Sequence, residues 1–408
     1  MTADPSPSAS AAAPGADEAP LAGIRVLDLG QYIAGPGAAM VLAELGAEVV
    51  KVEPIGGERA RHLGTLGASM VLAYNRGKRS IALDLRQPNA REVVLRLAAR
   101  SDVMIQNQRP GALERLGLDA RTLRERFPRL ICLSVSGFGA RGPSRGRPGF
   151  DIVGQAESGM MSITGEPDRM PQKVGSPIID SATAHLGAQA VLAALFRRER
   201  TGAGATIDAS LLESAMHLQA ATWTGHLVHG AQPMRVGDGQ PAAAPAAEPI
   251  RTLDGHVVVT AFDPAHWAAL CRLIGREDML SDPRFADNPS RVRNRDAMRE
   301  ALQASLGRYT SEACVALLAG AQIVVGAIRT YAQAQASADV QASGILIEAR
   351  AADGSAYRTL GLPYVIDGVP RPEPAAAPEV GADTDAVLAE LGYASDAIAG
   401  MRRDGTVA

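Results

Sequence analysis

The chain has 408 residues, which is long enough for two or more domains, with 46% hydrophobic residues and a formal net charge of -3. This composition is typical of a globular protein with a sizeable core, and it lacks the basic excess expected of a nucleic-acid-binding protein. The three cysteines lie far apart, without a CxxC pair or a Cys/His cluster, which argues against a zinc ribbon or a disulfide framework and favours a reducing cytoplasm.

The first 20 residues are rich in Ala, Ser and Pro and contain neither a basic segment nor a continuous apolar stretch. This composition predicts a disordered tail and not a secretory leader. Further along, charged residues such as Glu44 and Arg197 interrupt the Ala-rich segments. No segment reaches the roughly 18 uninterrupted apolar residues that a membrane-crossing helix needs, so we expect no membrane span.

From Gly23 onward, short apolar runs alternate with helical patterns. Strands are expected in the segments 24–30, 47–53, 80–85, 102–107 and 130–137, with helices between them, including 90–99 and 118–126. This alternation predicts a doubly wound α/β fold, in which helices cover both faces of a parallel sheet. The large domain is expected to span residues 21–215.

The second half of the chain begins with a long amphipathic pattern that predicts a helix over 180–200. A glycine turn, a short strand and a helix over 211–229 follow it. We place a linker at 216–235, a smaller α+β domain at 236–335, and a return linker with the C-terminal part of the large domain at 336–408. A last helix is expected over 384–391, followed by a polar tail.

Three familiar site motifs are absent. The segment 29–53 resembles a dinucleotide-binding fingerprint, but Met40 stands where a third small residue is required, so a tight turn before a helix is the better interpretation. Ser134 and Ser136 are out of frame for a GxSxG nucleophile elbow. His226 and His229 lack further ligands nearby, so no metal site is predicted.

The segment VGSPIIDSATAH brings Asp180 to the expected first turn of a helix. The simplest interpretation is an N-cap, in which the carboxylate accepts hydrogen bonds from backbone N–H groups. A catalytic interpretation needs further support. Pattern alone leaves both open.

Several segments, in this order, resemble the class III CoA-transferases, the CaiB/BaiF family that includes formyl-CoA transferase, carnitine CoA-transferase and α-methylacyl-CoA racemase. The resemblance spans residues 21–408 and implies a Rossmann-like large domain, a small domain and an interlocked homodimer. It also implies an acyl-CoA and a small carboxylic acid as substrates, with no permanently bound cofactor. The segments are LAGIRVLDLGQYIAGP, LGAEVVKVEP, NRGKRSIALDLR, DVMIQNQRPGALERLGL, SVSGFGARGP, GSPIIDSATAHLGAQAVLAALFRRERTGAGATIDASLLESA and GADTDAVLAELGY.

The resemblance implies that Asp180 is the nucleophile. In the family, this aspartate attacks an acyl-CoA thioester to form a mixed anhydride, and the released CoA thiolate then forms an aspartyl-CoA thioester. A carboxylate nucleophile keeps the acyl group activated, so the energy of the thioester is conserved. An aspartate at a helix N-terminus is expected to stay ionised, so the capping and catalytic interpretations are compatible.

Positions that match CoA contacts of the family lie after the first, third, fourth and fifth strands. Arg86, Arg109 and Arg115 are candidate phosphate partners because guanidinium groups donate paired hydrogen bonds, although each is also explained as a solvated surface residue. The positions are Ile33, Ala34, Leu83, Arg86, Asn107, Gln108, Arg109, Arg115, Phe150 and Asp151.

One departure from the family pattern is Pro54, which stands where some members have a basic residue after the second strand. Lys51, Arg59 and Arg61 are the candidates to supply a basic group in its place.

A second feature is the loop 237–241, which resembles the glycine-rich flap of the formyl-CoA transferase branch. Gly237, Gly239 and Gln240 would then close over the aspartate and shield its intermediates from water, with backbone N–H groups near the thioester. A flexible turn between domains is the other interpretation, and both stay open.

Racemases of the family pair the aspartate with a histidine, where this chain has Phe150. Phenylalanine carries no proton, and His185 lies about one and a half helical turns beyond Asp180, so transfer is preferred over racemisation. A CoA-binding homologue without catalysis is a further alternative. The resemblance favours dicarboxylates as the acids, because family members often transfer CoA from succinyl-CoA. Arg235 near the flap is a candidate partner for a second carboxylate, although an exposed arginine explains it equally, and formate, oxalate, carnitine and aromatic acids stay open.

Overall fold

The computed structural model describes residues 19–367 and 374–408, so the expected N-terminal tail lies almost wholly outside the described residues. The described chain divides into two compact units. The first contains the chain up to Ser158, residues 175–220 and the chain from Ala338 onward, and the second contains residues 159–174 and 221–337. Residues 159–174, which we placed in the large domain, thus group with the second unit, and the domain boundaries given above stay predictions.

The first unit is built on a six-stranded parallel sheet, as predicted. Its strand order is β3-β2-β1-β4-β5-β6, so the direction of winding reverses between β1 and β4. In open α/β sheets, ligands bind beyond the carboxyl ends of the strands at this switch point. The strands are β1 Arg25–Asp28, β2 Glu48–Glu53, β3 Lys78–Ala82, β4 Val103–Gln106, β5 Ile131–Ser136 and β6 Ala205–Ser210.

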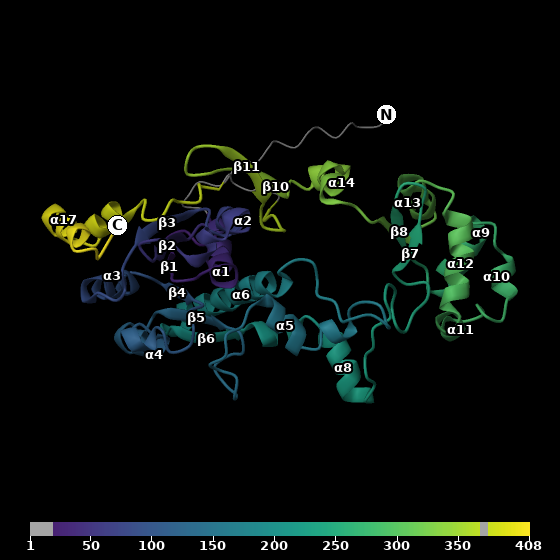
Figure 1. Cartoon of the computed structure of the whole chain (residues 1–408), viewed down its shortest axis with the longest axis horizontal. Coiled ribbons are helices and arrows are strands. Elements are labelled where there is room, and N and C mark those ends of the chain that lie inside the picture. Colours follow the sequence, from purple (N-terminus) through teal and green to yellow (C-terminus); the bar gives the residue numbers. More distant parts are fainter. Residues whose placement is uncertain (1–18, 368–373) are drawn as a thin grey trace. The chain divides into compact units, whose positions relative to one another are not determined.

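Helices cover both faces of this sheet. On one face, α1 (Ala34–Glu44) and α6 (Ile178–Thr201) pack against each other and against the strands (Figure 1). On the other face, apolar side chains of the strands form one core with those of α3 (Pro88–Ala99), α4 (Ala120–Arg126) and the C-terminal helices. Successive side chains of β5 point to opposite faces of the sheet, so this strand contributes to both cores. Cys132 belongs to the second core, whereas Leu133 faces Gly187 of α6.

Helix α6 is long and apolar enough to cross a membrane by length and composition, and 44% of its most apolar window is buried inside the protein. It packs against α1 and β5, as a core helix of a folded domain does. Its apolar character therefore has a sufficient explanation in this packing.

The C-terminal segment is more ordered than we expected. Helix α16 (Thr384–Glu390) is followed by α17 (Ser395–Arg403), so the prediction of a polar tail is wrong. Ile398 and Met401, spaced one turn apart, are buried against the sheet core, and Val407 forms a bridge with Leu83. A short helix with two inward positions has too weak a pattern to be recognised in isolation.

The expected helix over 211–229 is two helices, α7 (Leu211–His217) and α8 (Ala220–His229), and α6 begins two residues before its expected start. The side chain of Ser210 accepts a hydrogen bond from the Glu213 N–H and so caps α7. The other elements of the first unit are α2 Gly64–Tyr74, α5 Asp151–Glu157, α15 Ala338–Ala342 and the hairpin of β10 Leu346–Arg350 and β11 Ala356–Leu360.

The second unit contains a three-stranded antiparallel sheet of β7 (Glu248–Arg251), β8 (His256–Thr260) and β9 (Val324–Ala327). Its core is apolar and includes Trp267 and Leu270. Its helices are α8, whose residues 221–229 belong to this unit, α9 Pro264–Leu273, α10 Asp278–Ser281, α11 Asn288–Arg293, α12 Arg295–Leu306, α13 Ser311–Gly320 and α14 Tyr331–Ala336.

Candidate active site

A cavity of about 290 Å³ lies in the first unit beyond the carboxyl ends of β1, β4 and β5, at the switch point of the sheet. It is lined by the turn before α1, the loops after β4 and β5, and the first turn of α6. Eight of the positions named from the sequence line it together: Ile33, Ala34, Asn107, Gln108, Arg109, Arg115, Phe150 and Asp180.

Three positions named from the sequence do not line this cavity. The side chain of Leu83 is buried in the sheet core, and Arg86 is exposed and paired with Asp84. Asp151 is buried beneath the first turn of α6. The CoA contacts expected at Leu83 and Arg86 stay predictions, because neither residue lines the cavity.

Asp180 is the third residue of α6, and no backbone N–H group of the described residues donates to its side chain. Desolvation by burial is the larger cause, and the nearby charge of Asp151 the smaller, of a rise in the pKa of Asp180 to about 7. Burial thus acts against the expectation that a position at the helix N-terminus keeps this carboxylate ionised. Near neutral pH the group exists in both protonation states.

The N-terminus of α6 is capped by Asp151, which comes from α5. Its Oδ2 accepts hydrogen bonds from the N–H groups of Ile179 at 2.6 Å and Asp180 at 3.1 Å, and its Oδ1 accepts one from Gln155. Asp151 thus takes the role that the sequence suggested for Asp180. A cap supplied from another helix leaves the Asp180 carboxyl group available for chemistry, and no local sequence pattern reveals it.

Four arginines line the cavity. Arg147 is paired with Glu157, whereas Arg59, Arg109 and Arg115 form no ion pair with any described residue. Guanidinium groups without acidic partners, next to a single carboxyl group, make this a site for anions.

The three basic residues considered as substitutes for the one that Pro54 replaces have different surroundings. Lys51 is completely buried among acidic groups, and Arg61 is bound to Glu53. Of the three, Arg59 alone lines the cavity.

An aromatic pair forms part of the cavity wall. The rings of Tyr32 and Phe150 meet edge to face, with their centroids 5.6 Å apart. Tyr32 has a positive φ of 63°, which is uncommon for a bulky residue and costs about 1–3 kcal/mol unless surrounding contacts hold it. Sequence reasoning missed Tyr32, because a tyrosine after a strand is not by itself a signal.

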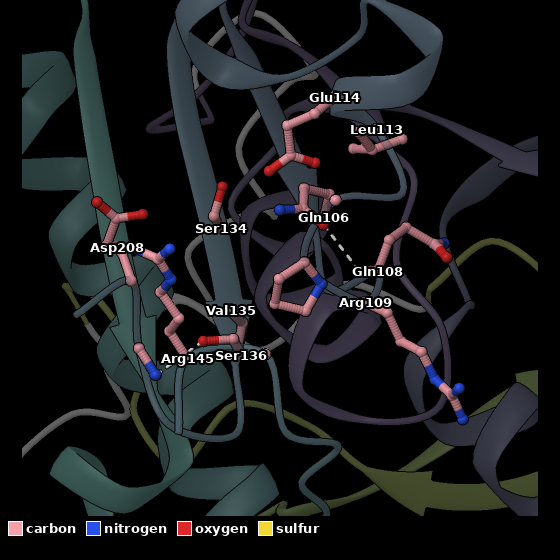
Figure 2. Close-up of a pocket in the computed structure, with 15 residues that line it drawn as sticks. Gln106, Gln108, Arg109, Leu113, Glu114, Ser134, Val135, Ser136, Arg145 and Asp208 are labelled. Atoms are coloured by element: carbon pink, nitrogen blue, oxygen red, sulfur yellow. Dashed lines mark hydrogen bonds between the residues drawn. The ribbon is translucent and has the colours of Figure 1, made fainter. Parts of the chain in front are cut away.

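A second, polar cavity of about 450 Å³ adjoins the first and shares five of its lining residues, including Gln108 and Arg109 (Figure 2). Gln106, Ser134 and Asp208 stand in register on β4, β5 and β6 and line it. Asp180 does not reach this cavity.

The expected flap belongs to the second unit. Gly237 and Gly239 have positive φ values of 68° and 98°, which glycine adopts without strain. The N–H of Gly237 donates to Gly165 and that of Gln240 to Ala246, so the loop is anchored within its own unit. Closure of this loop over Asp180 stays a prediction.

Arg235, which we considered as a partner for a second carboxylate, donates to the main-chain carbonyls of Ser162, Glu166 and Pro167. Its guanidinium group is therefore engaged in holding the 162–167 loop. Among the described residues, no group of three or more His, Cys, Asp or Glu side chains could hold a metal ion.

A family model described as CoA-transferase family III matches residues 21–384. The chain belongs to this family. It is 38% identical over 335 residues to a probable fatty acyl-CoA transferase of Mycobacterium tuberculosis, covering 77% of this chain and 84% of that protein. It is 34% identical over 383 residues to the succinate–glutarate CoA-transferase of Agrobacterium fabrum, covering 91% and 96%.

A crystal structure of a CaiB/BaiF family protein from Brucella suis superimposes with a TM-score of 0.82 at 34% identity, covering 91% of this chain and 99% of that one. The resemblance inferred from the sequence is confirmed, and the protein is an enzyme of the CoA-transferase type.

Proposed function

We propose that this CoA-transferase moves CoA from an acyl-CoA to a carboxylic acid through covalent intermediates on Asp180. The observation that carries the proposal is the position of Asp180, whose carboxyl group does not cap α6 and lines the cavity at the switch point of the sheet.

Each step exchanges one acyl bond. The ionised Asp180 carboxylate attacks the thioester carbonyl, the C–S bond breaks, and a mixed anhydride and CoA thiolate form. The thiolate attacks the aspartyl carbonyl of the anhydride, which releases the donor acid and leaves an aspartyl-CoA thioester. An acceptor carboxylate attacks that thioester, and the returning thiolate then attacks the acceptor acyl group and restores free Asp180.

The cavity offers suitable groups for the phosphates of CoA. Arg59, Arg109 and Arg115 have no acidic partner among the described residues, and Ile33 and Ala34 place the start of α1 against the cavity. Guanidinium groups and the free N–H groups of a helix N-terminus both bind phosphate. We propose that these residues bind the ADP part of CoA, with Asn107 and Gln108 beside them.

The acid is proposed to be a small dicarboxylate. The relative from Agrobacterium is named for succinate and glutarate, whereas the mycobacterial relative is named for fatty acyl groups. The family's use of succinyl-CoA stays as one of the two grounds for this preference, and the hydrogen bonds of Arg235 to main-chain carbonyls remove the other. The surplus of guanidinium groups in the cavity takes its place as support.

Racemisation requires a second base next to the α-carbon. Among the described residues that line the cavity, Asp180 is the only carboxyl group, and none is a histidine or lysine. Phe150 occupies the position of the racemase histidine, and His185 does not line the cavity. The cavity therefore contains the carboxyl group that transfer needs, whereas two-base epimerisation would lack its second base.

We also propose a cytoplasmic, interlocked homodimer. Helix α8 has no buried residue, and its Leu227 and Val228 are 75% and 67% exposed. Apolar side chains exposed in this way favour burial against another chain.

The test of the proposed function is the mass of the intact protein and of its peptides after incubation with succinyl-CoA, and separately acetyl-CoA, without an acceptor. A CoA adduct on the peptide containing Asp180 is expected. Uptake of solvent deuterium by a 2-methylacyl-CoA, without any adduct, would instead establish racemisation.

A further inference from the structure

From Gly30 to Tyr32, the turn between β1 and α1 is held by side chains, whereas Leu29 before them donates its N–H to the carbonyl of Ile105. The N–H of Gly30 donates to Asp28 Oδ1 at 2.7 Å, and Lys51 Nζ donates to the carbonyl of Gly30 at 2.8 Å. Both charged side chains are completely buried. Burying these two charges costs free energy unless their partners are kept in place. The conformation of the turn is therefore closely tied to the surrounding structure.

The next two residues of the turn are held in the same way. Asn107 accepts a hydrogen bond from the N–H of Gln31 and donates one to its carbonyl, at 2.7 and 2.8 Å. The N–H of Tyr32 donates to Glu58 Oε2 at 2.7 Å. Five consecutive main-chain groups are therefore bound by side chains from other parts of the unit.

Glu58 is the contact that fixes Tyr32. Its carboxylate is 1% exposed, and Oε1 receives Lys51 Nζ at 3.1 Å and Asn75 Nδ2 at 2.8 Å. With Oε1 occupied, Oε2 faces the backbone of the turn. The left-handed conformation of Tyr32 would otherwise be disfavoured for a tyrosine, so its persistence depends on this acceptor.

The conformation of Tyr32 directs its ring toward Phe150, and both rings line the cavity that contains Asp180. Two aromatic rings in edge-to-face contact form a stiff wall, because each restricts the rotation of the other. Because both rings line the cavity together with Asp180, they occupy space that a long acyl chain would need beside the CoA thiol.

We propose that Glu58 is a positioning residue that, through Tyr32, sets the size of the acyl group admitted next to Asp180. Tyr32 is the specificity-determining residue, and the substrate class is the CoA thioester of a short acid. This inference rests on the proposed function, since it takes the Asp180 cavity as the acyl site.

The test uses binding, so that it does not depend on turnover. In an Asp180→Asn background, the dissociation constants of acetyl-CoA and octanoyl-CoA are measured by calorimetry. Tyr32→Gly allows the positive φ and removes the ring. Compared with the protein that retains Tyr32, it should shift the ratio of the two dissociation constants by roughly tenfold or more in favour of octanoyl-CoA. Tyr32→Phe keeps the ring and should retain the ratio of the parent protein.

Glu58→Gln tests the positioning role. Its amide nitrogen must face a donor, either Tyr32 N–H or the Lys51 and Asn75 groups, so the cluster that holds the turn loses an acceptor in either orientation. In Glu58→Gln the ratio of the two dissociation constants should shift in favour of octanoyl-CoA, as in Tyr32→Gly. Hydrogen exchange of the Tyr32 amide should become faster. The matched control is Glu248→Gln, which neutralises a completely buried carboxylate of the second unit that pairs with two arginines, and it should leave the ratio unchanged.

An unchanged ratio of the two dissociation constants in Tyr32→Gly would show that the ring of Tyr32 does not limit the size of the acyl group. A shift in Tyr32→Gly without one in Glu58→Gln would overturn the positioning role, as would equal shifts in Glu58→Gln and Glu248→Gln. Failure of the proposed function shows differently, as the absence of a CoA adduct on Asp180 in the parent enzyme. Absence of acyl-CoA binding in every variant would overturn both.

Discussion

Beneath the turn that begins α1, the first unit buries charged side chains of both signs, including Asp28, Lys51 and Lys78, all completely buried. The second unit instead encloses an apolar core, and its buried Arg291 donates only to main-chain carbonyls. The second unit also buries the carboxylate of Glu248, which pairs with two arginines. The contrast teaches that a cluster of completely buried charges of both signs lies where the backbone next to the cavity is held in an unusual shape, whereas the interior of the second unit relies mainly on apolar packing.

The pKa values of the buried groups follow the same division. The pKa of Asp28 lies below its ordinary value, because Lys51 and Lys78 outweigh the effect of burial. Burial lowers the pKa of Lys78 to about 8, with Asp28 opposing this change. For Asp180 no cation compensates, and burial raises the pKa instead. The paired charges hold structure, and the unpaired one is available for reaction.

The largest effect is expected for Asp180→Asn. Loss of the carboxylate nucleophile should lower transfer by roughly 10³-fold or more, with the fold retained. Assays of acyl-CoA exchange together with circular dichroism check this. Substantial residual transfer and a persistent adduct would place the nucleophile elsewhere.

Asp180 also links stability to pH. Its pKa is about 7 in the folded protein and close to 3.8 when exposed, so the folded state binds an extra proton between these values. The resulting stabilisation is present below pH 4 and is lost as pH rises through 7, by roughly 4 kcal/mol at most. Asp180→Asn should remove this dependence in urea titrations from pH 4 to 8. An unchanged slope would show that the carboxyl group is not desolvated.

The two interiors are compared directly by Lys78→Met and Arg291→Met. The first leaves Asp28 buried with a weakened set of cations and should lower the free energy of unfolding by about 3–5 kcal/mol. The second leaves carbonyls without donors but no orphaned charge, and should cost about 1–3 kcal/mol. Denaturant titrations measure both. Equal losses in the free energy of unfolding would contradict the proposed difference between the two interiors.

A smaller effect is expected for Asp151→Asn. Removing its charge should lower the apparent pKa of Asp180 in the pH profile of kcat/KM, while the weakened cap of α6 costs about 1 kcal/mol. Gln155→Glu serves as the reverse test, since a second negative charge next to Asp151 should raise that pKa. A profile that neither substitution moves would mean that Asp180 does not sense Asp151.

The smallest effect is expected for Arg86→Ala. Arg86 is an exposed side chain paired with Asp84, so stability should not change measurably. If the contact implied by the family resemblance exists, the KM for the acyl-CoA should rise while kcat is retained. The same substitution at Arg115, which lines the cavity, should raise the KM more. An unchanged KM in Arg86→Ala would remove this residue from the CoA site.

The sequence by itself was enough to determine the alternating parallel sheet, the family and the position of Asp180. These depend on local periodicity and on motifs that are contiguous along the chain. The family resemblance also indicated Arg109, Arg115 and Phe150, and these residues line one cavity because loops after parallel strands meet at one edge of the sheet.

Only the tertiary structure decided that Asp151 and not Asp180 caps α6, that Glu58 holds Tyr32, and that the C-terminal segment packs as a helix. It also decided the pKa of Asp180, which depends on burial and on a charge 29 residues away. Such interactions join residues far apart in the chain. Their effects depend on distance and desolvation, which local sequence patterns do not encode.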